Sequence, residues 1–304
     1  MLHHLTIVVF AQNDTLRVST TQNAIGSMIP EVFSDQPWLT EEPANWSLAK
    51  RVPTMLAEPE QRFYTWATQH WMTGIGEVVD LGSFIGGSTA RLALGHALAG
   101  HSGKVHAYDR FTADEGVKRR TLYKQGIAPF EGNDIFELSK DLLSPWADRI
   151  TFHRGEIETQ GWTGEPIEIL CIDAFKKAVL ADIMVKQFFP ALVPGKSIII
   201  HQDFLHHKNP WLAAQMINLR SAVTPVAFVQ HDTMVFLVEQ PMRADLLSAA
   251  ELSDLTDAQI LDAIDKCRDW FAGFDLDRRL DTMSAALRAN PGVRVAWQMR
   301  NPPR

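Results

Sequence analysis

The stretch EVVDLGSFIGGSTARLA, residues 77–93, decides the fold. Its apolar start predicts a buried strand over 77–81, and the run that opens at Ser88 predicts a helix over 88–98. The glycines between them allow a tight turn and a close ligand approach that a Cβ would block. A strand, a glycine turn and a helix N-terminus surround a bound group with backbone N–H groups and the positive end of a helix dipole. The stretch therefore predicts a site for a nucleotide-like ligand.

The composition is that of a soluble globular chain with one large core. The 304 residues are 46% hydrophobic and 21% charged, which predicts a domain of about 200 residues plus appendages. The net charge of −7 argues against non-specific nucleic-acid binding. We see neither an apolar run long enough for a membrane span nor the basic start of a signal peptide. Cys171 and Cys267 are expected to be buried, reduced thiols of a cytoplasmic protein.

Strands and helices alternate beyond residue 77, which predicts a doubly wound α/β sheet. The expected strands are 77–81, 104–108, 150–153, 167–172 and 197–200, with helices at 88–98, 177–192 and 211–222 and a closing hairpin of 225–230 and 233–239. The strand at 167–172 is almost continuously apolar, as is typical of a parallel strand covered on both faces. A hairpin at the end of such a sheet favours an antiparallel last strand.

The chain divides into three parts. These are an N-terminal extension (1–55), a ligand-binding domain (56–242) that begins with a helix at 58–72, and a C-terminal helical appendage (243–304). The extension includes a predicted strand at 5–10 and either caps a substrate pocket or wraps over the core. The appendage shows a capping box at Thr256 and Gln259, and it packs on the core or mediates self-association. Alternating residues at 293–297 suggest an edge strand.

A long link, 110–149, separates the second and third expected strands and has the composition of a loop or lid, with a helix resuming at 135–146. Its basic residues either meet an anionic substrate or form a solvated helix face; they are Lys118, Arg119, Arg120 and Lys124.

Polar residues mark the carboxyl ends of the expected strands, where open α/β sheets bind ligands. They are Asp80, Asp109, Gly155-Glu156, Asp173 and His201-Gln202-Asp203. Asp109 follows the glycine turn by about 20 residues, the spacing of an acid that accepts ribose hydroxyls. The same position occurs in sites for NAD and for S-adenosylmethionine (SAM), and a simple turn former is the alternative.

The spacing Asp-x-Gly-x-x-x-Gly from Asp80 to Gly86 is not the dinucleotide pattern. It resembles the first motif of the class I SAM-dependent methyltransferases. Within that family, residues 171–177 (CIDAFKK) and 190–204 (PALVPGKSIIIHQDF) resemble the metal-dependent O-methyltransferase branch that includes the catechol and macrolide-sugar enzymes. The resemblance covers about residues 56–240. It implies a mostly parallel, seven-stranded Rossmann-like sheet that ends in an antiparallel hairpin.

The resemblance also implies which residues contact SAM. They are Asp80, Gly82, Ser83, Phe84, Gly86, Ser88, Thr89, Asp109, Arg110, Gly155, Glu156 and Asp173. An ordinary helix N-cap explains Ser88 and Thr89 equally well.

A magnesium site is the third implication of the resemblance. In that branch an Asp after the fourth strand and an acidic or amide pair after the fifth bind Mg²⁺, which holds two substrate hydroxyls. Asp173, Gln202 and Asp203 match these positions, and Lys176 matches the general-base lysine. Gln202 departs from the usual Asp, and an uncharged amide weakens a site for a hard cation. The metal therefore stays open, and without one Asp173 could hold the SAM amino group or a substrate hydroxyl.

Histidines offer a second route to a general base. His201, His206 and His207 follow the fifth strand, where an acceptor would lie, although each is equally explained as a loop residue. Our leading hypothesis is a SAM-dependent methyltransferase acting on a hydroxyl oxygen of a small or secondary metabolite, without nucleic-acid or membrane partners. The alternatives are a non-catalytic SAM-fold binding or assembly protein and an NAD-dependent oxidoreductase. The missing dinucleotide motif and the terminal hairpin argue against the oxidoreductase.

Overall fold

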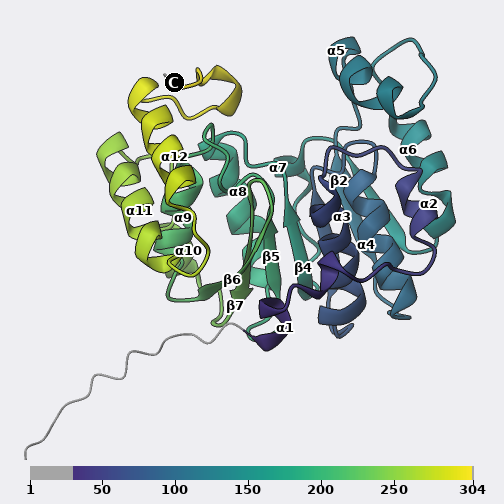
Figure 1. The fold of residues 1–304 in the computed structure, drawn as a ribbon, viewed down its shortest axis with the longest axis horizontal. Helices are drawn as coiled ribbons and strands as arrows, with labels where there is room; N and C mark the ends of the chain where they lie inside the picture. The colour runs from purple at the N-terminus through teal and green to yellow at the C-terminus, as the bar shows by residue number, and fades with distance from the viewer. Residues whose placement is uncertain (1–29, 303–304) are drawn as a thin grey trace, which may run out of the picture.

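A seven-stranded sheet forms the centre of the computed structural model, which describes residues 30–302 (Figure 1). Its order is β3-β2-β1-β4-β5-β7-β6. The strands are β1 (Glu77–Leu81), β2 (Val105–Asp109), β3 (Ile150–Arg154), β4 (Ile167–Ile172), β5 (Ile198–His201), β6 (Val223–Val229) and β7 (Thr233–Val238). Because β7 pairs antiparallel with both β5 and β6, the predicted mostly parallel, seven-stranded Rossmann-like sheet with an antiparallel hairpin at its end is confirmed. The strand predicted at 5–10 lies outside the described residues.

Helices cover both faces of the sheet, so its central strands are apolar on both sides. Val79 belongs to the core on one face, beneath the helices that follow β4 and β7. The adjacent Val78 belongs to the core on the other face, beneath the helices at the start of the chain. All six residues of β4 are buried. The alternation of Val78 and Val79 between two cores follows from the two-residue period of a strand. Cys171 and Cys267 are free and buried.

On one face lie α2 (Trp46–Lys50), α3 (Glu58–Trp66), which continues as one π-helical turn at Ala67–Trp71, and α4 (Gly87–Leu98). The helices α3 and α4 pack closely because Gly95 has no side chain. A Cβ there would lie 2.1 Å from the carbonyl oxygen of Thr65. The short α1 (Glu31–Ser34) precedes them. The helices predicted at 58–72 and 88–98 are thus confirmed.

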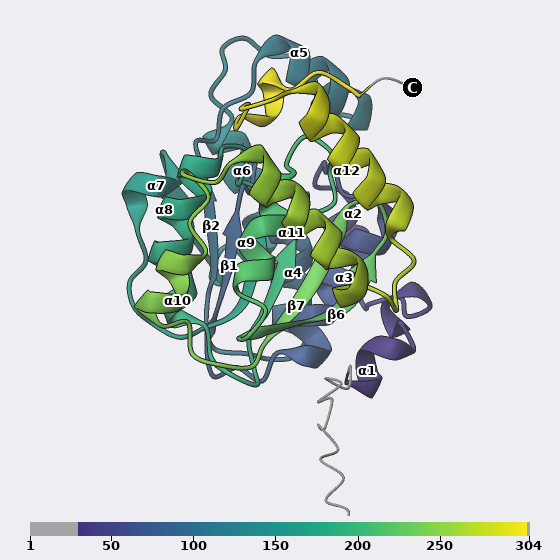
Figure 2. The ribbon, with the colours of Figure 1, turned by 90° about the vertical axis from the view of Figure 1, so that its left-hand side faces the viewer.

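On the other face lie α8 (Ala178–Phe188), α9 (Trp211–Asn218), α10 (Ala244–Ala249), α11 (Asp257–Trp270) and α12 (Asp277–Ala289). Figure 2 shows α11 and α12 running together over this side of the sheet. The capping box of Thr256 and Gln259 begins α11, and the apolar stripe from Ile260 to Phe271 is buried in the core. The appendage therefore packs on the core. The edge strand predicted at 293–297 is wrong, because this segment makes one isolated bridge and a 3₁₀ turn.

The link between β2 and β3 contains α5 (Glu115–Val117), a π turn at Lys118–Leu122 and α6 (Phe136–Leu142). A substrate role for Lys118 is wrong. Its ammonium is buried and donates to the carbonyl oxygens of Phe130 and Gly132, and it also pairs with Glu115. Arg119 binds the same carboxylate. Lys118 therefore stabilises the loop itself, whereas the pair of Arg119 is exposed and contributes little. The short α7 (Ile157–Gln160) follows β3.

A buried carboxylate on β4 joins the sheet to the end of the first long helix. Glu168 accepts hydrogen bonds from the backbone N–H and hydroxyl of Thr73, at 2.5 and 2.7 Å, and from the N–H groups of Gly74 and Ile75, at 2.9 and 3.1 Å. We expect Glu168→Ala to lower the free energy of unfolding by about 3–5 kcal/mol, because it leaves these donors unpaired next to a cavity.

Urea denaturation measures this loss directly. The matched control is Glu137→Ala, whose side chain is 76% exposed and whose effect should stay within about 0.5 kcal/mol. Equal unfolding midpoints for the two variants would show that Glu168 does not stabilise this junction.

Candidate functional site

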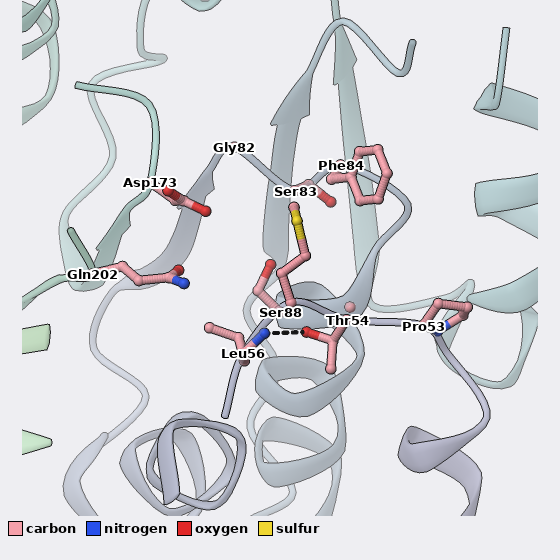
Figure 3. Close-up of a pocket in the computed structure, with 11 residues that line it drawn as sticks. Pro53, Thr54, Leu56, Gly82, Ser83, Phe84, Ser88, Asp173 and Gln202 are labelled. Carbon is pink, nitrogen blue, oxygen red and sulfur yellow. Dashed lines mark hydrogen bonds between the residues drawn. The ribbon is translucent and has the colours of Figure 1, made fainter. Parts of the chain in front are cut away.

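Two cavities open at the carboxyl ends of the strands, and they share Gly82 and Asp173. The first, which we call the small cavity, has a volume of about 280 Å³; it lies between residues 53–56, the glycine loop and Gln202 (Figure 3). The second, the large cavity, has a volume of about 740 Å³ and continues past Asp109 towards α8. A ligand that fills both must pass over the glycine turn.

The glycine loop is held by the first strand-end acid. Asp80 is buried, and its Oδ2 accepts hydrogen bonds from the hydroxyls of Ser88, at 2.8 Å, and Thr89, at 2.6 Å. Burial raises the pKa of Asp80 to about 6, and these two hydrogen bonds oppose the rise. Ser88 and Thr89 thus bind Asp80 instead of capping α4, whose N-cap is Gly86 with no side-chain hydrogen bond. The first N–H groups of α4 are left for a ligand in the small cavity.

The loop glycines have different tasks. Gly82 has φ +104°, and a Cβ there would lie 3.2 Å from the backbone carbonyl of Asp173, so the turn after β1 can run against the turn after β4. Gly86 has φ +99°, but its Cβ would meet Leu143 at 2.5 Å. Gly86 lines neither cavity, and its contact with a ligand stays a prediction. The residue is needed for packing.

Asp109 orders the loop and borders the large cavity. Its Oδ2 accepts the N–H of Phe84 at 3.0 Å, and its Oδ1 accepts the N–H of Phe111 at 2.6 Å. Burial raises the pKa of Asp109, and the two backbone hydrogen bonds oppose the rise. A carboxylate offers about four acceptor positions, so each oxygen keeps one for a ligand hydroxyl.

The structure divides the other predicted ligand contacts into three groups. Ser83, Phe84 and Ser88 line the small cavity, and Arg110 and Glu156 line the large one. Asp80, Thr89 and Gly155 lie behind the lining of both. Gly155 instead makes room for Gln160, whose Nε2 a Cβ would approach to 2.6 Å.

Three of the predicted catalytic and metal positions after β4 and β5 form an ion-paired cluster: Asp173, Lys176 and Asp203. Lys176 Nζ lies 2.6 Å from Asp173 Oδ1 and also donates to Asp203 Oδ2. Burial lowers the pKa of Lys176, but the two carboxylates outweigh it and hold that pKa above its ordinary value. A lysine that stays charged is a poor proton acceptor, so the structure does not support Lys176 as the general base.

The residues present do not fit a resident magnesium ion. The Lys176 ammonium already bridges the two carboxylates that would bind it. The third predicted ligand, Gln202, uses its amide oxygen to accept a hydrogen bond from the hydroxyl of Tyr64 at 3.4 Å. Within residues 30–302 we find no group of three His, Cys, Asp or Glu side chains arranged to hold a metal.

The prediction of His201 as a catalytic base is wrong. Its ring is buried edge-on against Phe175 and Phe204, 5.5 and 5.6 Å away between ring centroids. Burial lowers the pKa of His201 to about 3, which makes it a weak base near neutrality. His206 and His207 stack on each other at 4.7 Å, outside the lining of both cavities.

Residues of the N-terminal extension and of the C-terminal appendage line the cavities. A cap over the pocket was one of the two predicted roles of the extension, whereas the appendage was not expected there. Residues 53–56 form one side of the small cavity. The C-terminal segment pairs with the chain after β4 through a bridge between Lys177 and Val295, and this places Trp297 at the large cavity. This bridge joins segments more than a hundred residues apart, so no local pattern signals it. None of the helices within residues 30–302 is long and apolar enough to cross a membrane.

Comparison with known proteins gives likenesses of fold. No protein-family model and no curated protein matches the sequence. The O-methyltransferase NovP is 12% identical over 62% of this chain and 82% of its own, with a TM-score of 0.44. A putative O-methyltransferase from Klebsiella pneumoniae is 13% identical over 69% and 96%, with a TM-score of 0.44. The Podospora anserina methyltransferase PaMTH1, bound to S-adenosylhomocysteine (SAH), is 12% identical over 70% and 89%, with a TM-score of 0.40.

Proposed function

We propose that the protein is a SAM-dependent methyltransferase that methylates an oxygen of a small hydroxylated metabolite. The observation that carries the proposal is the junction of two cavities at Gly82 and Asp173. One cavity contains an uncapped helix start, and the other contains Asp109 with free acceptor positions. SAM has a carboxylate at one end, a ribose diol towards the other and a positive sulfur between them, so its groups match this order.

The small cavity suits the methionyl part of SAM. Its carboxylate would accept hydrogen bonds from the first N–H groups of α4, where the helix dipole favours a negative charge. Gly87 allows the segment before α3 to close over this point, because a Cβ there would lie 2.5 Å from the carbonyl oxygen of Pro53.

The large cavity suits the adenosyl part. Asp109 would accept both ribose hydroxyls, as an acid at the end of the second strand does in nucleotide sites. Arg110 and Glu156 border the cavity beyond it, and Ile157 and Met184 supply apolar surface for a base. The positive sulfur would then lie near the shared residue Asp173, whose carboxylate favours a cation.

SAM supplies an activated methyl group on a cationic sulfur, so the chain has to align an acceptor and exclude water. The cluster of Lys176, Asp173 and Asp203 borders the junction of the cavities. Its ammonium would stabilise the negative charge that an acceptor oxygen carries as it attacks. This favours oxygen as the methylated atom. The Asp173 carboxylate, which lines both cavities, would take the hydroxyl proton, and SAH would leave as the sulfur–methyl bond breaks.

Transfer of tritiated methyl groups from SAM tests the proposal. The wild type, given a panel of phenols and hydroxylated sugars, should label at least one acceptor. Asp109→Ala should label none at the same SAM concentration. Binding of SAH without labelling of any acceptor would favour the non-catalytic alternative. Binding of NAD without binding of SAH would favour the oxidoreductase.

A further inference from the structure

Lys176 lies between two carboxylates where a divalent ion would otherwise bind. We propose that its ammonium is the permanent cation of this site, so that methyl transfer needs no metal and the acceptor is held through a single oxygen. The first part stands on the cluster itself. The second part rests on the proposed function.

The ammonium and a divalent ion compete for the same oxygens. Lys176 Nζ contacts Asp173 Oδ1 at 2.6 Å and also contacts Asp203 Oδ2. Mg²⁺ requires a near-octahedral set of oxygens at about 2.0–2.1 Å, which these carboxylates cannot form around an intervening ammonium. The two cations would also repel each other strongly at such a distance in a partly buried site. Binding of a metal therefore requires Lys176 to leave.

The backbone of Lys176 is fixed by the C-terminal appendage. Its N–H donates to the carbonyl oxygen of Ala174 at 2.8 Å, and its own carbonyl oxygen accepts the N–H of Ala296 at 2.9 Å. Next to it, the N–H of Ala178 donates to the carbonyl oxygen of Arg294 at 3.1 Å. The lysine stem therefore starts from an anchored backbone, from which its ammonium reaches both carboxylates.

Gln202 fits the same interpretation. An amide carries no charge, so the residues nearest the ammonium are two carboxylates and one neutral group. Two carboxylates and one ammonium already leave one negative charge in a partly buried place, and a third carboxylate would add another that the single lysine could not balance. The Tyr64 hydroxyl makes a long contact of 3.4 Å with Gln202 Oε1, which leaves that oxygen a second acceptor position.

The number of donors limits how an acceptor binds. A lysine ammonium has three N–H donors, and the carboxylates of Asp173 and Asp203 use two of them. One donor remains for one acceptor oxygen. A magnesium ion, by contrast, holds two neighbouring hydroxyls of the acceptor at once. The site should therefore accept compounds with a single reactive hydroxyl and gain nothing from a vicinal pair.

Titration with Mn²⁺, followed by electron paramagnetic resonance in the absence of SAM, tests the first part. The wild type should leave Mn²⁺ free up to millimolar concentration. Lys176→Met should bind it at least tenfold more tightly, and Lys176→Met combined with Asp203→Asn should lose that gain. Lys176→Arg, which keeps the positive charge, should behave as the wild type.

Micromolar Mn²⁺ binding by the wild type that disappears in Asp203→Asn would overturn the proposal, and so would a folded Lys176→Met variant that gains no binding. Circular dichroism and thermal melting establish folding, and Lys176→Gln replaces the Met variant if that one does not fold.

Methyl labelling tests the second part, on the acceptor. Labelling of a phenol should be unchanged by a chelator, and labelling of catechol should not increase when Mg²⁺ is added. Chelator-sensitive labelling would overturn the proposal, whereas absence of labelling with any acceptor counts against the proposed function and leaves the Mn²⁺ result decisive.

Discussion

Asp109→Ala should weaken SAH binding by about 100-fold or more, which corresponds to about 3 kcal/mol. The variant removes the acceptors of the ribose hydroxyls. It also releases the N–H groups of Phe84 and Phe111, which the carboxylate now holds at 3.0 and 2.6 Å. Loss of hydrogen bonds to a charged group costs about 1.5–3 kcal/mol each, and the glycine loop becomes less ordered at the same time. Isothermal titration calorimetry measures the loss.

Asp148→Ala is the matched control for this variant, because Asp148 is an exposed aspartate in the loop before β3. It should bind SAH as the wild type does. Asp109→Asn, which keeps one oxygen acceptor, should fall between the two. A folded Asp109→Ala protein with unchanged affinity for SAH would mean that the carboxylate serves the loop alone.

Asp173→Asn should reduce methyl transfer by about 100-fold or more, while the dissociation constant for SAH changes by less than about tenfold. The substitution keeps the shape of the side chain but removes the charge that directs the Lys176 ammonium, 2.6 Å away. SAH lacks the positive sulfur, so its binding does not depend on this carboxylate as the reaction does. Single-turnover labelling and calorimetry on the same preparation separate the two effects.

A different result for Asp173→Asn would assign this residue to cofactor binding instead of methyl transfer. Equal losses in methyl transfer and in SAH binding would show that Asp173 mainly holds the cofactor, for example by accepting a hydrogen bond from the amino group of SAM. Glu165→Gln is the control, since Glu165 is exposed in the loop before β4 and lines neither cavity. It should alter neither quantity by more than about threefold, as expected for an exposed charge.

Local patterns predicted the parts of this protein whose structure is decided locally. The strand, turn and helix of 77–98 follow from hydrophobic period and glycine, and β4 at 167–172 was predicted to the residue. The capping box at Thr256 and the terminal hairpin were likewise read from short stretches. The position of Asp109 at the ligand edge followed from the general geometry of open α/β sheets.

Contacts between distant segments determine the roles of several residues that local sequence patterns could not predict. Gly86 was expected at the ligand and also makes room for Leu143, and His201 was expected as a base but is enclosed by two phenylalanines. The ion pairs of Lys176 depend on where two separate loops meet. In each case the residue type was compatible with both roles, and only the neighbours supplied by distant segments distinguish them.

Calorimetric titration of the wild-type protein with SAH, with NAD in a parallel titration, tests the central claim most directly. The account predicts binding of one SAH per chain with a micromolar dissociation constant and no binding of NAD at the same concentrations. A folded protein that gives no heat with SAH, while binding NAD or neither ligand, would contradict the assignment of the two joined cavities to SAM.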